Sequence, residues 1–176
     1  MKYLVIIDAQ NDFITGSLGT PEAKSKIRPL AEYIKNFDGE LIFTADTHGN
    51  KYASSLEGKK LPVPHCVIHT NGWKINSLIK NAAKNKNWTL ITKNKFGTIK
   101  IQKPIKNPEE IYIAGFCTDI CVISNALLLK TLFPNTPIKL LADLCAGTTP
   151  AKHAAAVSVM ESCQIDVIYA TDTETM

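Results

Sequence analysis

Cys121 is the residue whose type and surroundings best suit covalent chemistry. It follows the apolar run 111–114 and Gly115, and it precedes the mainly apolar residues 123–129. A β-branched run that ends in glycine and then takes up helical spacing predicts a strand, a tight turn and a helix. Because a helix N-terminus favours an anion, we expect the Cys121 thiol to ionise readily and act as a nucleophile. The alternative interpretation is an ordinary buried cysteine.

Charged residues follow the other apolar runs of the chain. Each predicted strand of this kind ends at a side chain with a formal charge: Asp8, Asp46, Lys93 or Asp143. The carboxyl ends of parallel strands share one edge of a sheet, so these groups can meet Cys121 in one cleft. A single charge at such a position commonly marks only the chain leaving the core. Three of them beside a cysteine at a helix start indicate a reactive site.

Asp8, Lys93 and Cys121 together supply what amide hydrolysis requires. A carboxylate can take the thiol proton and later return it to leaving ammonia or amine. An ammonium can stabilise the thiolate, and the sulfur can attack the carbonyl carbon. Backbone N–H groups of the turn 115–121 are the expected donors to the developing oxyanion.

The segment 46–72 shows little periodicity and is predicted to be a functional loop. It offers four candidate metal ligands, Asp46, His48, Glu57 and His65. Two imidazoles with carboxylate oxygens suit Zn²⁺, Fe²⁺ or Mn²⁺, with water to complete the shell. His69 is a competing ligand, and the alternative is a loop of solvated polar residues. His153, in a late helix, is predicted to be structural.

Strands and helices alternate along the whole chain, which predicts a parallel, doubly wound sheet. We expect a single α/β domain over residues 1–176, built as three α/β/α layers around a mainly parallel sheet of about six strands. The predicted strands are 3–7, 41–45, 88–92, 110–115, 137–142 and 165–169. The predicted helices are 21–38, 74–85, 121–132 and 150–161.

Composition excludes several classes of protein. The net charge of +4 is spread over lysines with acids interspersed, which does not favour nucleic-acid binding. The apolar run 3–7 is too short for a signal sequence or a membrane span, so we expect a cytoplasmic protein with no membrane partner. The five cysteines are an odd number without framework spacing, and we expect reduced thiols.

Three segments of the chain resemble motifs of one protein family, and the resemblance extends over nearly the whole chain. Residues 8–13 are similar to D-x-Q-x-D-F, residues 115–122 to G-x-x-T-D-x-C-V, and residues 92–96 to a lysine motif at a strand end. These are motifs of the isochorismatase-like cysteine hydrolases, the superfamily that contains nicotinamidases. The resemblance implies that Asp8, Lys93 and Cys121 are catalytic, although Lys95 lies close to the same motif. It also makes Cys121 the nucleophile rather than Cys117.

The same resemblance implies a metal centre. The segments 46–48 and 64–66 are similar to the D-x-H and P-H-C elements of nicotinamidases. By this resemblance Asp46, His48 and His65 bind a divalent metal, zinc with iron or manganese as alternatives, and Glu57 falls where some members supply a further carboxylate. The metal is expected to hold the pyridine nitrogen of nicotinamide.

The resemblance further implies a cis peptide between Phe116 and Cys117, which aims the N–H groups of Cys117 and Cys121 at the oxyanion. It also implies a homo-oligomer and a role in NAD salvage. Two departures concern the substrate: no tryptophan precedes Pro64, and Cys117 stands where a smaller residue is usual. Aromatic walls for a substrate ring are then expected from Phe13, Phe96 and Phe116.

The function expected from all of this is a metal-containing cysteine amidohydrolase that acts on a small-molecule amide, of the nicotinamidase type. One alternative is another hydrolase on the same scaffold, acting on a ureido, carbamoyl or isochorismate-type substrate. A second is a thiol redox protein that uses Cys117 and Cys121. A third is an inactive binding module.

Overall fold

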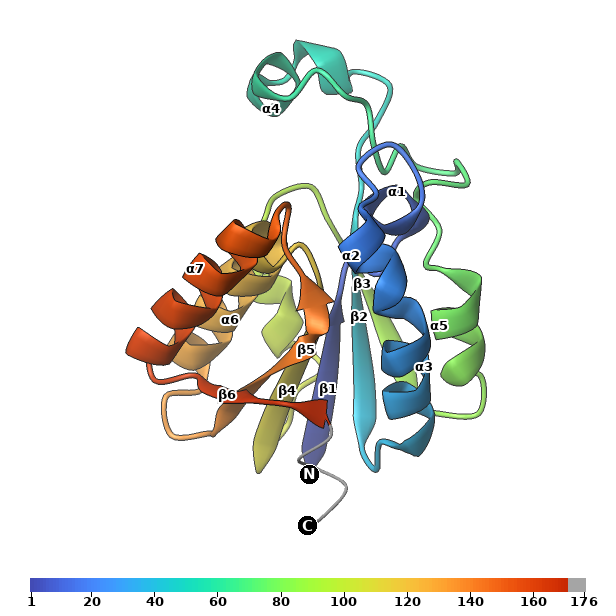
Figure 1. Cartoon of the computed structure of the whole chain (residues 1–176). Coiled ribbons are helices and arrows are strands. Elements are labelled where there is room, and N and C mark those ends of the chain that lie inside the picture. Colours follow the sequence, from blue (N-terminus) through green and yellow to red (C-terminus); the bar gives the residue numbers. More distant parts are fainter. Residues whose placement is uncertain (171–176) are drawn as a thin grey trace.

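A six-stranded sheet forms the centre of the computed structural model, which describes residues 1–170 (Figure 1). The strands are β1 (Lys2–Ile7), β2 (Glu40–Asp46), β3 (Trp88–Lys93), β4 (Glu110–Phe116), β5 (Ile138–Ala146) and β6 (Asp166–Ile168). Their order is β3-β2-β1-β4-β5-β6, and every neighbouring pair is parallel. The sheet is therefore wholly parallel where we expected a mainly parallel one. The predicted domain ran to residue 176, and its last six residues lie outside the described ones.

Helices cover both faces of the sheet, as the three-layer prediction requires. Figure 1 shows α2, α3 and α5 on one side and α6 and α7 on the other. The helices are α1 (Asn11–Ile14), α2 (Pro21–Ser25), α3 (Ile27–Asn36), α4 (Leu56–Lys60), α5 (Ser77–Ala82), α6 (Ile123–Leu132) and α7 (Pro150–Ser162). Two 3₁₀ turns (Tyr52–Ser54 and Ile99–Gln102) and one π-helical turn (Thr118–Val122) join them. Across residues 1–170, the helices are too short or too polar to cross a membrane.

The helix predicted over 21–38 is broken in two after Ser25. Thr20 caps α2, because its hydroxyl accepts a hydrogen bond from the N–H of Ala23 at 3.1 Å. Pro29 explains the break, since in a continuous helix it would lack the N–H that bonds to the Ser25 carbonyl and its ring would clash there. In the structure Pro29 lies in the first turn of α3, where that N–H is not needed.

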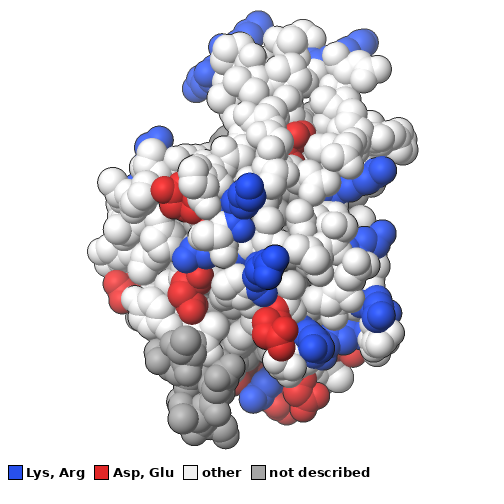
Figure 2. Space-filling view, turned by 45° about the vertical axis from the view of Figure 1, so that its right-hand side comes forward, with Lys and Arg blue, Asp and Glu red and all other residues white. Residues whose placement is uncertain are grey.

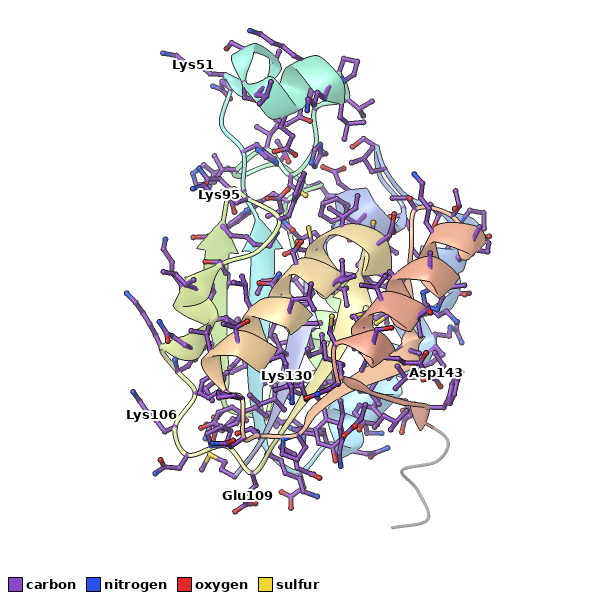
Figure 3. All side chains as sticks on the ribbon, turned by 90° about the vertical axis from the view of Figure 1, so that its left-hand side faces the viewer. Lys51, Lys95, Lys106, Glu109, Lys130 and Asp143 are labelled. Carbon is purple, nitrogen blue, oxygen red and sulfur yellow. The ribbon has the colours of Figure 1, made fainter. Side chains whose placement is uncertain are left out.

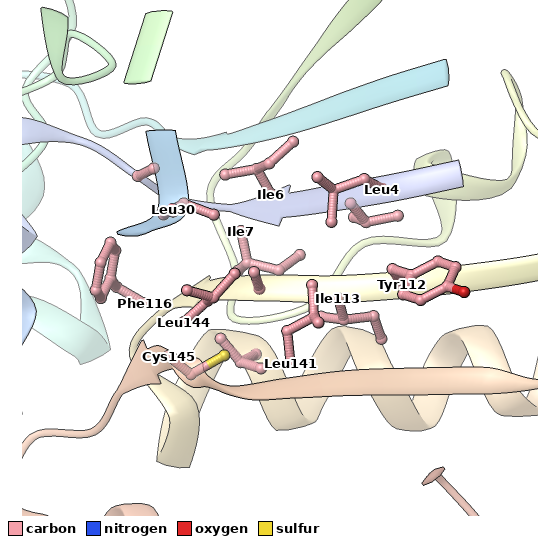
Figure 4. Close-up of a cluster of buried hydrophobic side chains, with 14 of the residues drawn as sticks. Leu4, Ile6, Ile7, Leu30, Tyr112, Ile113, Phe116, Leu141, Leu144 and Cys145 are labelled. Atoms are coloured by element: carbon pink, nitrogen blue, oxygen red, sulfur yellow. The ribbon is translucent and has the colours of Figure 1, made fainter. Parts of the chain in front are cut away.

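The core lies against the central strands β1 and β4. Residues 4–7 of β1 and 113–114 of β4 are fully buried, which is why both strands read as continuous apolar runs. Figure 4 shows Leu4, Ile6 and Ile7 of β1, Ile113 of β4 and Leu141 of β5, all of which belong to the buried core. A rigid, close-packed sheet centre fixes the positions of the strand ends above it.

Asp143 was predicted to end the fifth strand, and this prediction is wrong. Strand β5 continues to Ala146, and its pairing with β4 is irregular: Ile113 pairs with Leu140, but Gly115 pairs with Cys145. Asp143 lies within this bulged stretch, and its Oδ1 accepts a hydrogen bond from the N–H of Ala170 at 2.9 Å. Figure 3 places Asp143 beside β6, away from the edge where the other charged strand ends meet.

The segment 46–72 projects from the body as an arm that carries α4 (Figure 1). It is more regular than predicted, with the 3₁₀ turn Tyr52–Ser54 and α4, which Ser55 caps through a 2.9 Å hydrogen bond from the N–H of Gly58. On the face in Figure 2, lysines and acids are interspersed below this arm.

Candidate active site and metal centre

Three segments bring Asp8, Lys93 and Cys121 together at the carboxyl edge of the sheet. Asp8 directly follows β1, Lys93 is the last residue of β3, and Cys121 lies in the π-helical turn after β4. Lys93 Nζ is 2.5 Å from Asp8 Oδ2 and 3.4 Å from Cys121 Sγ. All three side chains are buried.

Thr44 of β2 holds the Asp8 carboxylate in place. Its hydroxyl donates to Asp8 Oδ1 at 2.6 Å and accepts from the N–H of Asp8 at 3.1 Å. Asp8 has a φ of 44°, in the left-handed region, which turns the chain sharply out of β1. The hydroxyl therefore occupies one carboxylate oxygen and leaves Oδ2 to Lys93.

The turn after β4 places Cys121. Gly115 has a φ of 124°, and a Cβ there would strike the carbonyl oxygen of Ile7 on β1, so only glycine lets the two strands approach this closely. The peptide between Phe116 and Cys117 is cis, as the family resemblance implied. The buried side chain of Asn125 then holds the Cys121 carbonyl through a 2.7 Å hydrogen bond from Nδ2.

A second contact supports the same turn from α7. Thr118 Oγ1 and His153 Nδ1 are 2.8 Å apart, and Thr118 is fully buried. Both oxygens of the Asp119 carboxylate accept from Thr148, at 2.7 Å from its N–H and 2.6 Å from its hydroxyl. His153 thus supports the turn that carries Cys121.

Burial and neighbouring charge set the protonation of the three groups. Burial raises the pKa of Asp8, and the Lys93 ammonium only partly opposes it. Burial disfavours the charge on Lys93, but the carboxylates of Asp8 and Asp46 outweigh this and raise its pKa. Burial, followed by the Asp8 carboxylate, raises the pKa of Cys121 well above its ordinary value. The expected easy ionisation at a helix start is therefore wrong: the thiol keeps its proton next to a carboxylate that can take it.

Four side chains of the arm and its base converge beside these residues. Asp46, His48, Glu57 and His65 each offer a ligand atom, and these atoms all lie within 4.8 Å of one another. His48 Nε2 is 2.8 Å from Asp46 Oδ2 and 3.7 Å from Glu57 Oε1. His65 Nε2 is 3.5 Å from the same Asp46 oxygen and 3.7 Å from Glu57 Oε1.

The donor set fits a divalent metal. Two ligand atoms on one Zn²⁺ lie at most about 4.4 Å apart, so small side-chain movements close all four donors around one ion. His65 Nδ1 lies 2.9 Å from the Val63 carbonyl and donates to it, which leaves the lone pair of Nε2 directed into the cluster. The ring of Tyr52 packs edge-on against both imidazoles, at 4.7 Å from His48 and 5.1 Å from His65.

The metal-ligand cluster and the reactive groups share one residue. Asp46 directs Oδ2 at the two imidazoles, while its Oδ1 lies 3.8 Å from Lys93 Nζ. A cavity of about 370 Å³ opens beside this cluster. It is lined by Thr47, His48, Gly49, Lys51, Tyr52, Ser55, Glu57 and Asn94. Both halves of the site are thus linked, and one side of the cluster is reachable from outside.

The remaining predicted residues lie in different surroundings. The ring of Phe13 packs 5.6 Å from that of His65, at the wall of the cluster. Phe116 is fully buried, whereas Phe96 is 52% exposed. Cys117 is half-buried in the turn before Cys121.

Two residues that could be confused with site residues lie elsewhere. Lys95 is exposed, and Figure 3 shows it on the outside of the molecule. His69 is exposed and its ring contacts Trp73 at 6.1 Å, and it is not among the cluster ligands found in residues 1–170.

Sequence reasoning missed three polar residues that hold the site. Thr44 lies inside an apolar strand, Gln10 follows Asp8, and Asn125 lies in an apolar helix. Each is fully buried and bonds to a site residue. For Thr44 and Asn125 the available signal was a polar residue inside an apolar run, since a buried polar group needs a partner. Gln10 lies in a polar segment, which does not carry this signal.

Comparisons with known proteins agree with this fold. The Isochorismatase domain family matches residues 2–172. The nicotinamidase/pyrazinamidase of Mycobacterium tuberculosis is 24% identical over 185 residues, covering 96% of this chain and 98% of that protein.

Two solved structures share the fold. The yeast nicotinamidase bound to the inhibitor nicotinaldehyde has a TM-score of 0.84 at 20% identity, covering 96% of this chain and 100% of that chain. The pyrazinamidase of Pyrococcus horikoshii in complex with zinc has a TM-score of 0.76 at 24% identity, covering 96% of this chain and 98% of that chain. The chain therefore belongs to the Isochorismatase family, where its similarity to nicotinamidases implies an amide hydrolase.

Proposed function

We propose that this protein is a metal-containing nicotinamidase that hydrolyses nicotinamide to nicotinate and ammonia through a thioester on Cys121. The observation that carries the proposal is the contact of one ammonium with both halves of the site. Lys93 Nζ touches Asp8 and Cys121, and it lies 3.8 Å from Asp46 of the metal-ligand cluster. An amide held at the cluster by its ring nitrogen would thus lie beside a nucleophile.

Acylation begins with the thiol proton. Cys121 gives this proton to Asp8 as its sulfur forms a bond to the amide carbon, and Lys93 stabilises the negative charge on sulfur during the transfer. The carbonyl oxygen becomes an oxyanion, which accepts hydrogen bonds from the backbone N–H groups of Cys117 and Cys121. Asp8 then returns the proton to the amide nitrogen, the carbon–nitrogen bond breaks, and ammonia leaves a thioester.

Deacylation uses the same groups in turn. Asp8 takes a proton from water as the water oxygen attacks the thioester carbon. The carbon–sulfur bond breaks, the proton on Asp8 returns to the Cys121 sulfur, and the nicotinic acid product gives its remaining proton to solvent and leaves as nicotinate. Burial raises the pKa of both groups, which supports this exchange because the two compete for one proton.

Asp46, His48, Glu57 and His65 would hold the divalent metal, for which zinc is proposed because the relative from P. horikoshii is a zinc complex. When bound, this ion supplies a Lewis acid that fixes the pyridine nitrogen. Phe13 is the proposed wall for the ring, because it packs against His65. A further solved structure with this fold, PnC1 from L. infantum in complex with nicotinate, has a TM-score of 0.83 at 18% identity. Its ligand is consistent with the proposed pyridine ring.

Ammonia release from nicotinamide tests the proposal. The wild-type protein is assayed as isolated, after chelation and after zinc is restored, and Cys121→Ala serves as the blank. We expect release that needs both the thiol and the metal, and a thioester adduct on Cys121 in quenched samples by mass spectrometry. Cys117→Ala is expected to keep the adduct.

Other outcomes separate the alternatives. A folded, zinc-loaded protein that leaves nicotinamide intact but cleaves a ureido or carbamoyl compound through Cys121 would be a different hydrolase on the same scaffold. Turnover of a vinyl ether such as isochorismate would survive Cys121→Ala. A disulfide exchange activity that needs both Cys117 and Cys121 would indicate a redox protein. Assembly into a homo-oligomer and a cytoplasmic location stay predictions.

A further inference from the structure

Gln10 lies between the two halves of the site and is fully buried. It is two residues past Asp8, and its backbone bridges to Ile75 on the segment after the arm. Its side chain makes three hydrogen bonds of 2.8 Å. Oε1 accepts from the N–H of Asp46, and Nε2 donates to the carbonyls of Asp46 and Trp73.

These bonds replace a missing part of the sheet. The last paired residues of β1 and β2 are Ile6 and Phe43, so the backbone of Asp46 extends beyond the β1 ladder. A buried peptide group needs partners for both its N–H and its C=O. The carboxamide of Gln10 has the same donor and acceptor as a peptide and supplies both. On its other side, Asp46 pairs with Lys93 of β3.

Asp46 is the residue whose position matters to both halves. Its carboxylate lies 2.8 Å from His48 Nε2 through one oxygen and 3.8 Å from Lys93 Nζ through the other. The carboxylate is one methylene away from the backbone atoms that Gln10 holds. A shift of this backbone would move the carboxylate relative to both the imidazole and the ammonium.

We propose that Gln10 is a positioning residue for the metal centre: its carboxamide stands in for a strand and fixes Asp46 as a ligand. This role rests on the proposed metal site at Asp46, His48, Glu57 and His65, and not on the identity of the substrate. Ligand-supporting groups of this kind commonly change metal affinity by about 10–100-fold.

The test compares two buried amides that each lose three hydrogen bonds. Gln10→Met keeps the length of the side chain and removes its polar atoms. Asn125→Leu is the matched control, because Asn125 is equally buried and its bonds go to Cys121, Phe96 and Thr98, not to a metal ligand. Zinc affinity of the stripped proteins is measured by competition with a chelating dye, and stability by thermal unfolding.

We expect Gln10→Met to lower zinc affinity by about 10–100-fold, while Asn125→Leu lowers the melting temperature and keeps wild-type zinc affinity. Equal zinc affinity in Gln10→Met and wild type would overturn the role, and so would an equal loss in both variants. If Gln10→Met does not fold, Gln10→Asn gives the same comparison, since its amide is one methylene too short to span both groups. A wild-type protein that binds no zinc would remove the metal site and this role together, whereas missing nicotinamide turnover alone would leave this result standing.

Discussion

Lys93 Nζ lies 3.4 Å from the sulfur of Cys121, although the two residues are 28 positions apart in the chain. Lys93 ends β3 and Cys121 follows β4, and these two strands are not neighbours in the sheet. Lys93 reaches across the ends of β2 and β1 to make this contact. It also pairs with Asp8 at the end of β1. One ammonium therefore holds Asp8 and Cys121 in a common position.

Removing this ammonium tests its role. We expect Lys93→Met to lower kcat/KM for nicotinamide by about 10²–10⁴-fold, because the thiolate and the Asp8 carboxylate lose their only cationic contact among residues 1–170. The matched control is Lys95→Met, since Lys95 is exposed. Steady-state ammonia release measures both. A larger loss for Lys95→Met than for Lys93→Met would reverse the assignment of the strand-end lysine.

Replacement of Thr44 is predicted to shift the pH profile of kcat/KM. Asp8 must be ionised to take the thiol proton, so activity is present above its pKa and is lost as pH falls through it. The Thr44 hydroxyl lowers the pKa of Asp8, partly offsetting the larger effect of burial. Thr44→Val removes that donor, and we expect the acid limb of kcat/KM to move to higher pH. Thr44→Ser keeps the donor and should keep the wild-type limb; identical profiles for both variants would argue against Asp8 as the base.

His65 and His69 both lie in the arm, but their replacement is predicted to change zinc affinity differently. His65→Ala removes a donor from the cluster, and we expect zinc affinity to fall by about 100-fold or more. His69→Ala should leave zinc affinity unchanged, because His69 is exposed and outside the cluster. Competition with a chelating dye measures both variants. A comparable loss in His69→Ala would mean that the arm binds zinc through another set of ligands.

One added methyl group is predicted to lower stability strongly at Gly115 and to leave it almost unchanged at Gly49. At Gly115 the Cβ would strike the Ile7 carbonyl in a left-handed backbone, so Gly115→Ala should lower the free energy of unfolding by roughly 3 kcal/mol or more. At Gly49 nothing lies within 4 Å of an added Cβ, and Gly49→Ala should change stability by less than about 0.5 kcal/mol. Urea unfolding compares the two. Equal stability would contradict the close approach of β1 and β4.

The sequence predicted the site best where an apolar run ends in a charged residue. Asp8, Asp46 and Lys93 stand out because apolar runs stop at them, and the parallel arrangement of the adjacent strands β1, β2 and β3 brings these ends together. The same logic failed at Asp143. There the strand bulges and continues through Leu144 to Ala146, and a change in register leaves no mark in an apolar pattern.

The supporting residues could not be assigned from the sequence. Gln10 and Thr44 bond to groups 36 residues away, and only the folded register decides which polar side chain meets which backbone group. The pKa of Cys121 was also misjudged for this reason. Its position near a helix start is visible in the sequence, whereas its burial against Asp8 depends on the packing of the whole edge.

Strand β3 stands at the margin of the sheet, with β2 as its single strand neighbour in the described part of the chain. Backbone segments of this kind open locally at a lower free energy than central strands. Because Lys93 is the last residue of β3, such an opening would withdraw the ammonium while β1 and β4 stay intact. The protein should then lose activity in mild denaturant before its ellipticity changes, so that inactivation and global unfolding are two separate events.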